Sequence, residues 1–141
     1  MILELSQSHY DDVLDTWEKS VAATHHFLKP QEIKFYKTAI SKYGLPPLKL
    51  FGIYDKSILS GFIGLSETKV EMLFVHPDYI GTGIGKKLMS FAMQNPKIKF
   101  IDVNEENPHA LAVYRHWGFT VISRDELDDS GKPHPILHLS R

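Results

Sequence analysis

The sequence contains no cysteine, no long apolar run and no excess of either charge. Without cysteine there is no disulfide, no thiolate metal ligand and no cysteine nucleophile. The apolar stretches fall well short of the roughly 20 residues that cross a bilayer as a helix, so no membrane role is expected. Sixteen basic residues stand against seventeen acidic ones, a balance that argues against general binding of nucleic acid.

The N-terminal residues 1–5 carry neither a basic segment nor a long apolar segment. We therefore expect no signal peptide and a protein that works in the cytoplasm. With 43% hydrophobic and 23% charged residues, the composition is typical of a folded chain. Because 141 residues is the usual size of one domain, we expect a single domain over residues 1–141.

The hydrophobic pattern changes period along the chain, which predicts both helices and strands. Apolar residues recur at steps of three and four between residues 9 and 23, as on one face of a helix. Pro30 suits the first turn of a second helix, which Gly44 ends. Strands are expected at residues 2–5, 48–54, 58–65, 69–75, 99–103, 120–127 and 136–139, and two further helices at residues 86–94 and 108–117.

The order of these segments predicts an α/β fold of the α+β kind. The three middle strands form an antiparallel meander, and strand–helix–strand crossovers follow them. We therefore expect one mixed, mostly antiparallel central sheet of about seven strands, flanked by helices on both faces.

A glycine-rich turn separates the strand at 69–75 from the helix at 86–94, with the sequence Gly81-Thr82-Gly83-Ile84-Gly85. Glycines at alternate positions let the backbone turn tightly and direct N–H groups into one concavity. The helix that follows adds unpaired N–H groups and the positive end of its dipole, and Lys86 adds charge. The turn is thus a candidate site for pyrophosphate. The alternative is a mobile glycine loop before an ordinary helix.

The spacing of the glycines disfavours two common phosphate motifs. A Walker loop needs four residues between its glycines and a Ser or Thr where Lys87 stands. A dinucleotide fingerprint needs its third glycine one residue later. No Gly-x-Ser-x-Gly elbow of a serine hydrolase is present, and no histidine pair has a strong metal-ligand spacing, so no metal is expected.

A second motif begins at Asn107 and has the form Asn-x-x-Ala-x-x-x-Tyr-x-x-x-Gly-Phe. Ala110 and Tyr114 stand four residues apart and therefore share one helix face. Gly118 suits the end of that helix. With the glycine turn and this motif in this order, the sequence resembles the GNAT family, the Gcn5-related N-acetyltransferases, and in particular its small bacterial members.

The resemblance implies the GNAT fold and an N-acetyltransferase. Such an enzyme moves the acetyl group of acetyl-CoA to a primary amine of a small molecule, a peptide or a protein, by direct attack in a ternary complex. A non-catalytic acetyl-CoA sensor or regulatory module is the alternative. Dimers are common in the family, so the resemblance leaves room for a homodimer. The family's loop usually opens with Arg or Gln where this sequence has Ile80, so affinity is lower unless Lys86 compensates.

The resemblance also assigns the residues that bind the cofactor. The pantetheine arm would pair with the backbone of one strand, the pyrophosphate would lie on the glycine turn, and an asparagine amide would contact the arm. The residues implied are Leu73, Phe74, Val75, Gly81, Thr82, Gly83, Ile84, Gly85, Lys86, Asn107 and Tyr114. Asn107 also stands where a helix cap is expected, and it can do both.

Two residues are candidates for acid–base chemistry. Tyr114 is the expected acid for the departing thiolate, since a phenol near pKa 10 is close to a thiol near 8.5; otherwise it is a tyrosine packed on a helix face. Glu71, in an apolar strand, is the expected base, acting through a water or by attracting a cationic amine. Strand alternation also allows an exposed Glu71 with neither role. His76 is the runner-up base.

The acceptor pocket is expected near the end of the first helix, the region that covers the acceptor site in this fold. The candidates are Trp17, His25, His26 and Phe27. The alternative is that these residues belong to the core or to the surface.

Overall fold

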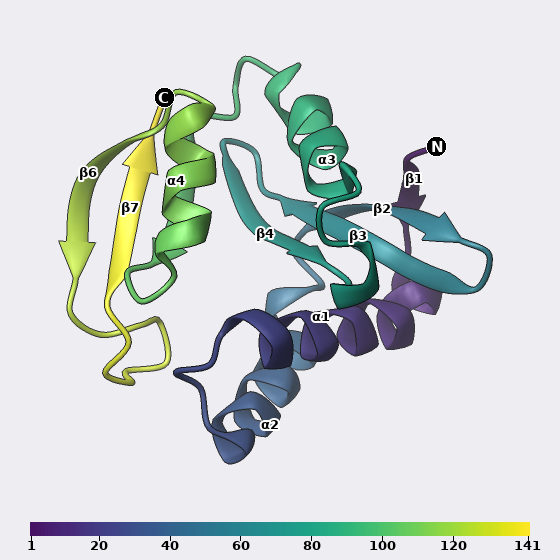
Figure 1. Cartoon of the computed structure of the whole chain (residues 1–141), viewed down its shortest axis with the longest axis horizontal. Helices are drawn as coiled ribbons and strands as arrows, with labels where there is room; N and C mark the ends of the chain where they lie inside the picture. The colour runs from purple at the N-terminus through teal and green to yellow at the C-terminus, as the bar shows by residue number, and fades with distance from the viewer.

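The computed structural model describes residues 1–141 and contains one seven-stranded sheet with the order β1-β2-β3-β4-β5-β7-β6 (Figure 1). The strands are β1 (Leu3–Leu5), β2 (Lys49–Asp55), β3 (Ile58–Leu65), β4 (Lys69–Val75), β5 (Phe100–Asn104), β6 (Thr120–Asp125) and β7 (Ile136–Ser140). The α-helices are α1 (Tyr10–Thr24), α2 (Pro30–Ala39), α3 (Ile84–Met93) and α4 (Pro108–His116). Single 3₁₀ turns lie at Gln7–His9 and Pro77–Tyr79. The predicted fold class is confirmed.

Strands β4 and β5 are the one parallel pair in the sheet, and they pair only at their beginnings. Lys69 pairs with Phe100 and Val70 with Ile101, after which the two strands diverge. All other neighbouring strands are antiparallel. One backbone edge of β4, over residues 71–75, therefore has no strand partner.

A β-bulge in β4 accounts for this divergence. Gly64 of β3 pairs with Met72, and the next residue, Leu65, pairs with Val70, so Glu71 is an extra residue on β4. A bulge bends its strand and increases the local twist. The bulge therefore directs the second half of β4 away from β5, in the part of the sheet where the site forms.

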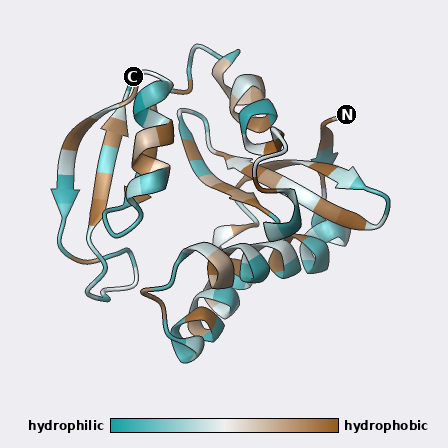
Figure 2. Ribbon diagram, viewed as in Figure 1, coloured by the Kyte–Doolittle hydropathy of each residue, from teal (hydrophilic) through white to brown (hydrophobic).

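Helices cover both faces of the sheet, as predicted, and each face has its own core. On one face, α1 packs Val13, Trp17 and Val21 against Leu50 and Phe62. On the other face, residues of α3 and α4 pack against apolar residues of β3, β5 and β7. In Figure 2, α1 and α2 alternate between polar and apolar residues, which is the pattern of helices with one apolar side against the rest of the protein.

The second helix differs from the expected span of 30–44. The α-helix ends at Ala39, and a π-helical turn, Ile40–Gly44, follows it. The backbone N–H of Leu45 then bonds to the carbonyl of Ile40 at 2.9 Å. This wider turn places the Leu45 side chain in the core, where it is fully buried. No helix has the length and apolar character that a bilayer span requires.

Candidate active site

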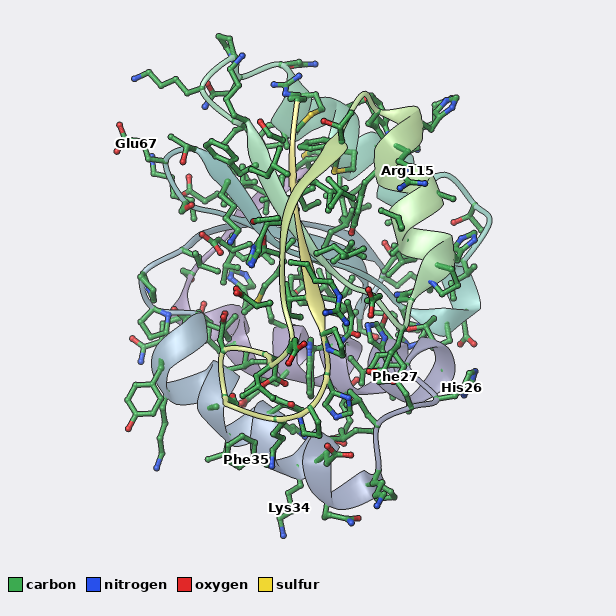
Figure 3. The ribbon with its side chains drawn as sticks, turned by 90° about the vertical axis from the view of Figure 1, so that its left-hand side faces the viewer. His26, Phe27, Lys34, Phe35, Glu67 and Arg115 are labelled. Carbon is green, nitrogen blue, oxygen red and sulfur yellow. The ribbon has the colours of Figure 1, made fainter.

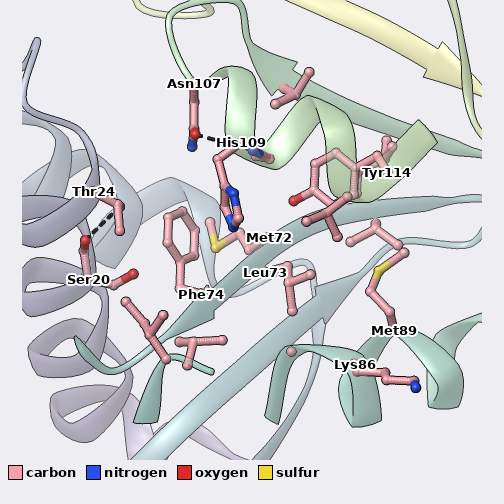
Figure 4. Close-up of a pocket in the computed structure, with 18 of the residues that line it drawn as sticks. Ser20, Thr24, Met72, Leu73, Phe74, Lys86, Met89, Asn107, His109 and Tyr114 are labelled. Atoms are coloured by element: carbon pink, nitrogen blue, oxygen red, sulfur yellow. Dashed lines mark hydrogen bonds between the residues drawn. The ribbon is translucent and has the colours of Figure 1, made fainter. Parts of the chain in front are cut away.

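A cleft of about 1120 Å³ opens where β4 and β5 diverge (Figure 4). Its walls come from β4, β5, the end of α1, the glycine turn with the start of α3, and α4. The predicted residues that line it are His25, Glu71, Leu73, Phe74, Val75, Gly81, Gly83, Ile84, Gly85, Lys86, Asn107 and Tyr114. The divergence of the strands thus brings both sequence motifs to one cavity.

The glycine turn presents free backbone donors at one end of the cleft. Gly81 and Gly83 have φ values of 83° and 89°, in the left-handed region that favours glycine. The first bond of α3 runs from the N–H of Lys87 to the carbonyl of Gly83 at 3.0 Å. The N–H groups of residues 84–86 therefore have no partner within the helix. This arrangement fits a pyrophosphate group.

Thr82 shapes the turn from within. Its N–H and its hydroxyl both donate to the carbonyl of Tyr79, at 3.2 and 2.5 Å, and its side chain does not line the cleft. Ile80 does line the cleft and is 53% exposed. The apolar side chain of Ile80 thus lies at the end of the cleft that the glycine turn forms, beside the free N–H groups.

Asn107 caps helix α4 and keeps a second group free. Its Oδ1 accepts a hydrogen bond from the N–H of Ala110 at 3.3 Å. Its Nδ2 makes no hydrogen bond within the protein. The residue lines the cleft, so its amide N–H₂ remains available as a donor to a ligand.

Tyr114 places its ring in the core and its hydroxyl at the cleft. The side chain is 8% exposed and packs edge-on against Phe119. The hydroxyl has no partner in the protein and points into the cleft (Figure 4). Burial raises the pKa of Tyr114 to about 12. The phenol is therefore protonated at neutral pH and can donate a hydrogen bond or a proton.

Glu71 lines the cleft beside a small ionic network. Its Oε2 accepts from the Ser66 hydroxyl at 2.8 Å, and its Oε1 lies 3.7 Å from Lys69 Nζ. Lys69 also donates to Asp102 at 2.6 Å. Burial opposes the charge of Lys69, but the bonds to Asp102 and the charge of Glu71 outweigh it and raise the pKa of Lys69. The Glu71 carboxylate is thus partly paired.

His76 lies outside the cleft. It is buried and lines a second hollow of about 610 Å³ between α1 and the β2–β3 turn. Its Nδ1 accepts a hydrogen bond from the N–H of Asp78 at 3.1 Å. The structure therefore does not bring His76 to the residues around Tyr114.

Of the four residues expected at the acceptor pocket, His25 lines the cleft. Trp17 is 4% exposed and packs edge-on against Phe74, with ring centroids 6.4 Å apart. His26 lies at the surface (Figure 3). Phe27 lies between the rings of His25 and His134, at 5.3 and 5.5 Å.

Several lining residues carried no functional prediction. Ser20 and Thr24 stand one helical turn apart at the end of α1, and His109 extends from the first turn of α4 into the cleft (Figure 4). The four-residue spacing of Ser20 and Thr24, directly before His25, is a sequence signal for a shared face. No comparable signal exists for His109, because its orientation depends on how α4 packs.

Comparisons with known proteins agree with this geometry. The sequence model of one protein family, the GNAT acetyltransferase domain, matches residues 14–135 of this chain. The chain is 34% identical over 143 residues to the peptidyl-lysine N-acetyltransferase YjaB of Salmonella typhimurium, covering 99% of this chain and 98% of that protein. The solution structure of apo YjaB from Escherichia coli matches with a TM-score of 0.86 at 32% identity, covering 99% of this chain and 95% of that one. A crystal structure of the PaiA N-acetyltransferase from Thermoplasma acidophilum in complex with coenzyme A shares the fold, with a TM-score of 0.74 at 18% identity, and covers 100% of this chain and 98% of that one.

Proposed function

We propose, since the chain belongs to the GNAT family of acetyltransferases, that it acetylates the ε-amine of lysine side chains in peptides or proteins. The acyl donor is acetyl-CoA, which supplies a thioester whose sulfur leaves as a thiolate. The observation that carries the proposal is the cleft itself, which joins a phosphate-binding turn, a free strand edge and a tyrosine hydroxyl. The lysine acceptor is supported by relatives such as YjaB, which match over nearly the whole chain.

The donor binds, in this proposal, along the unpaired edge of β4. The free N–H groups of residues 84–86 hold the pyrophosphate, with Lys86 nearby. The backbone of residues 73–75 pairs with the pantetheine arm as an added strand, and the Asn107 amide contacts the same arm. These groups orient the thioester between Tyr114 and the end of α1.

Tyr114 acts as the acid in this proposal. Its hydroxyl points into the cleft and is not bonded to any protein group, so no internal bond has to break before it serves the thiolate. The raised pKa ensures that the hydroxyl carries its proton.

Glu71 attracts the acceptor. A lysine reaches the enzyme as an ammonium ion, and the Glu71 carboxylate is a negative group at the cleft wall. Ser66 and Lys69 fix its orientation. Because attraction acts on binding, Glu71 is expected to affect KM for the lysine substrate more than kcat.

The test uses a peptide with a blocked N-terminus and a single lysine, and follows the release of free thiol from acetyl-CoA. Glu71→Gln should raise KM for the peptide about two- to fivefold, the factor that corresponds to about 0.4–1 kcal/mol for a partly exposed charge pair. Glu67→Gln is the matched control, because Glu67 is exposed and does not line the cleft (Figure 3). No thiol release by the wild-type protein would contradict the proposed function.

A further inference from the structure

The histidine at the end of α1 has one ring nitrogen held and the other free. Thr24 Oγ1 donates its single hydrogen to the carbonyl of Ser20 at 2.7 Å. The same oxygen lies 2.8 Å from Nδ1 of His25. Because a carbonyl can only accept, the Thr24 hydroxyl has no hydrogen left for His25 and must accept from its Nδ1–H. Neutral His25 is thereby fixed as the Nδ1–H tautomer, with a lone pair on Nε2.

The free nitrogen belongs to a ring that lines the cleft. His25 contacts Phe74 of β4, with ring centroids 6.3 Å apart, and Nε2 makes no hydrogen bond. In Figure 4, Ser20 and Thr24 lie on one side of Phe74 and Tyr114 lies on the other. The α1 end and the α4 end thus flank the β4 edge from opposite sides.

We propose that His25 is the catalytic base, and that its Nε2 takes the proton from the lysine nitrogen that attacks the thioester. This inference rests on the proposed function and deepens it, because it assigns the proton that the sequence pattern left among Glu71, His76 and water. Thr24 is the positioning residue, which holds the tautomer through a chain from the Ser20 carbonyl. A held Nδ1–H with a free partner nitrogen is the arrangement that orients a basic imidazole.

The surroundings of His25 keep it neutral. Burial lowers its pKa, and the charge of His26 lowers it further. The contacts of the ring include the Thr24 hydroxyl and the uncharged rings of Phe27 and Phe74. The ring is therefore unprotonated at neutral pH and ready to accept.

None of the other histidines combines these properties. The Nδ1 atoms of His9 and His76 accept hydrogen bonds from backbone N–H groups, so their neutral forms carry the hydrogen on Nε2. Both nitrogens of His134 and of His138 are engaged with carboxylates. His109 and His116 line the cleft but have no hydrogen bond that would orient their rings, and His26 is exposed and does not line the cleft.

Glu71 is the less suitable acceptor of the proton. One of its oxygens already accepts from Ser66, and the other faces the cation of Lys69. Both carboxylate oxygens are therefore already engaged by protein groups, and a proton on either would compete with one of these contacts, so Glu71 suits attraction of the substrate better than proton transfer. Attraction and proton transfer are thus divided between Glu71 and His25.

The step balances as follows. The lysine enters as an ammonium ion, and Nε2 of His25 takes one of its protons, which frees the lone pair of the nitrogen. The nitrogen then forms a bond to the carbonyl carbon, the carbon–sulfur bond breaks, and the sulfur takes the proton of the Tyr114 hydroxyl. The second proton that the nitrogen loses on forming the amide passes to solvent. His25 leaves the step as an imidazolium and Tyr114 as a phenolate, and exchange with solvent restores both groups.

The first test reads the tautomer without any turnover. Long-range ¹H–¹⁵N spectra of the ¹⁵N-labelled protein, with His25 assigned by its loss in His25→Gln, should show a protonated Nδ1 and an unprotonated Nε2 above pH 7. Nε2 should take its proton at a lower pH than an ordinary histidine does, because burial lowers the pKa of His25. Thr24→Val should mix the tautomers and Thr24→Ser should restore the pattern. A hydrogen on Nε2 of the neutral wild-type ring would overturn the proposal.

The second test measures by enzyme kinetics how much His25 contributes as a base. His25→Gln should lower kcat for the lysine peptide about a hundredfold at pH 7, at the low end of what a positioned base contributes. Its acetyl-CoA affinity by calorimetry should stay within twofold, which also shows that the variant is folded. The rate should recover as pH rises towards the ordinary pKa of lysine, near 10.4, because the substrate then needs no base.

A substitution of the neighbouring residue, His26, predicts the direction in which the pH profile should shift. His26→Gln removes a charge that lowers the pKa of His25, so the acid limb of the pH profile should move to higher pH. A His25→Gln enzyme with kcat within threefold of wild type and the same acid limb would overturn the assignment. Absence of turnover in the wild-type enzyme would instead refute the lysine acceptor, and the NMR test would still decide the state of His25.

Discussion

Replacing Gly83 with alanine tests the proposed phosphate-binding turn through its backbone alone. Gly83 has a φ of 89°, and a Cβ atom added there would meet no atom within 4 Å. The substitution therefore adds no clash, and its whole effect is the cost of a left-handed backbone, about 1–2 kcal/mol for a residue with a side chain. Residues 80–83 are exposed, so the free protein can relax the turn and avoid this cost.

Binding of acetyl-CoA must then restore the left-handed turn, because only that conformation presents the free N–H groups of residues 84–86. The cost appears in the affinity, and about 1–2 kcal/mol corresponds to a rise in Kd of roughly 5- to 30-fold. Isothermal titration with acetyl-CoA measures this change. The unfolding free energy in urea should fall by less than 1 kcal/mol.

Gly131→Ala is the matched control for this experiment. Gly131 also has a positive φ, 76°, and open space around it, but it lies between β6 and β7 and does not line the cleft. It should leave the Kd for acetyl-CoA unchanged. If Gly83→Ala binds acetyl-CoA within twofold of wild type, the turn does not bind in the way argued.

Three further predictions concern single side chains. Tyr114→Phe should lower kcat about a hundredfold or more and change acetyl-CoA affinity less than twofold, because the hydroxyl has no internal partner; unaltered turnover in a steady-state assay would remove Tyr114 from its role. Ile80→Arg should lower the Kd for acetyl-CoA two- to fivefold at low salt, as an added surface cation does, and calorimetry at 0.5 M salt should erase the gain; a gain that survives would have another cause. His134 bonds to Glu32 and Glu106, and although burial opposes its charge, these bonds raise its pKa. Thermal melts should therefore show a stabilisation that is complete below pH 6.5 and is lost as the pH rises through the raised pKa. His134→Gln should remove this dependence of stability on pH. An equal slope in the variant would refute the ion-pair account.

The order of helices and strands was predictable because it depends on local periodicity. The site was predictable only where a motif carried it. Asn107 and Tyr114 stand at fixed positions in one motif, so the sequence places both on α4. The bulge at Glu71 was not predictable, because it depends on the register between Gly64 and Met72 rather than on either residue.

The residues of the acceptor pocket were harder to predict, because no motif contains them. Trp17 belongs to the same apolar stripe that predicted helix α1, and that stripe packs on the sheet, which explains why Trp17 is in the core. His25 was expected in the pocket, but its chemistry depends on the direction of the Thr24 hydroxyl. A hydrogen bond between two neighbouring side chains leaves no periodic trace in the sequence.

The proposed transfer of acetyl from acetyl-CoA to a lysine ε-amine can be tested by tandem mass spectrometry of the product. A peptide with a blocked N-terminus and one lysine, incubated with the enzyme and acetyl-CoA, should gain a single acetyl group located on the lysine Nε. A matched peptide with arginine in place of that lysine should gain none. Acetylation of free small amines without any modification of the lysine peptide would contradict the claim.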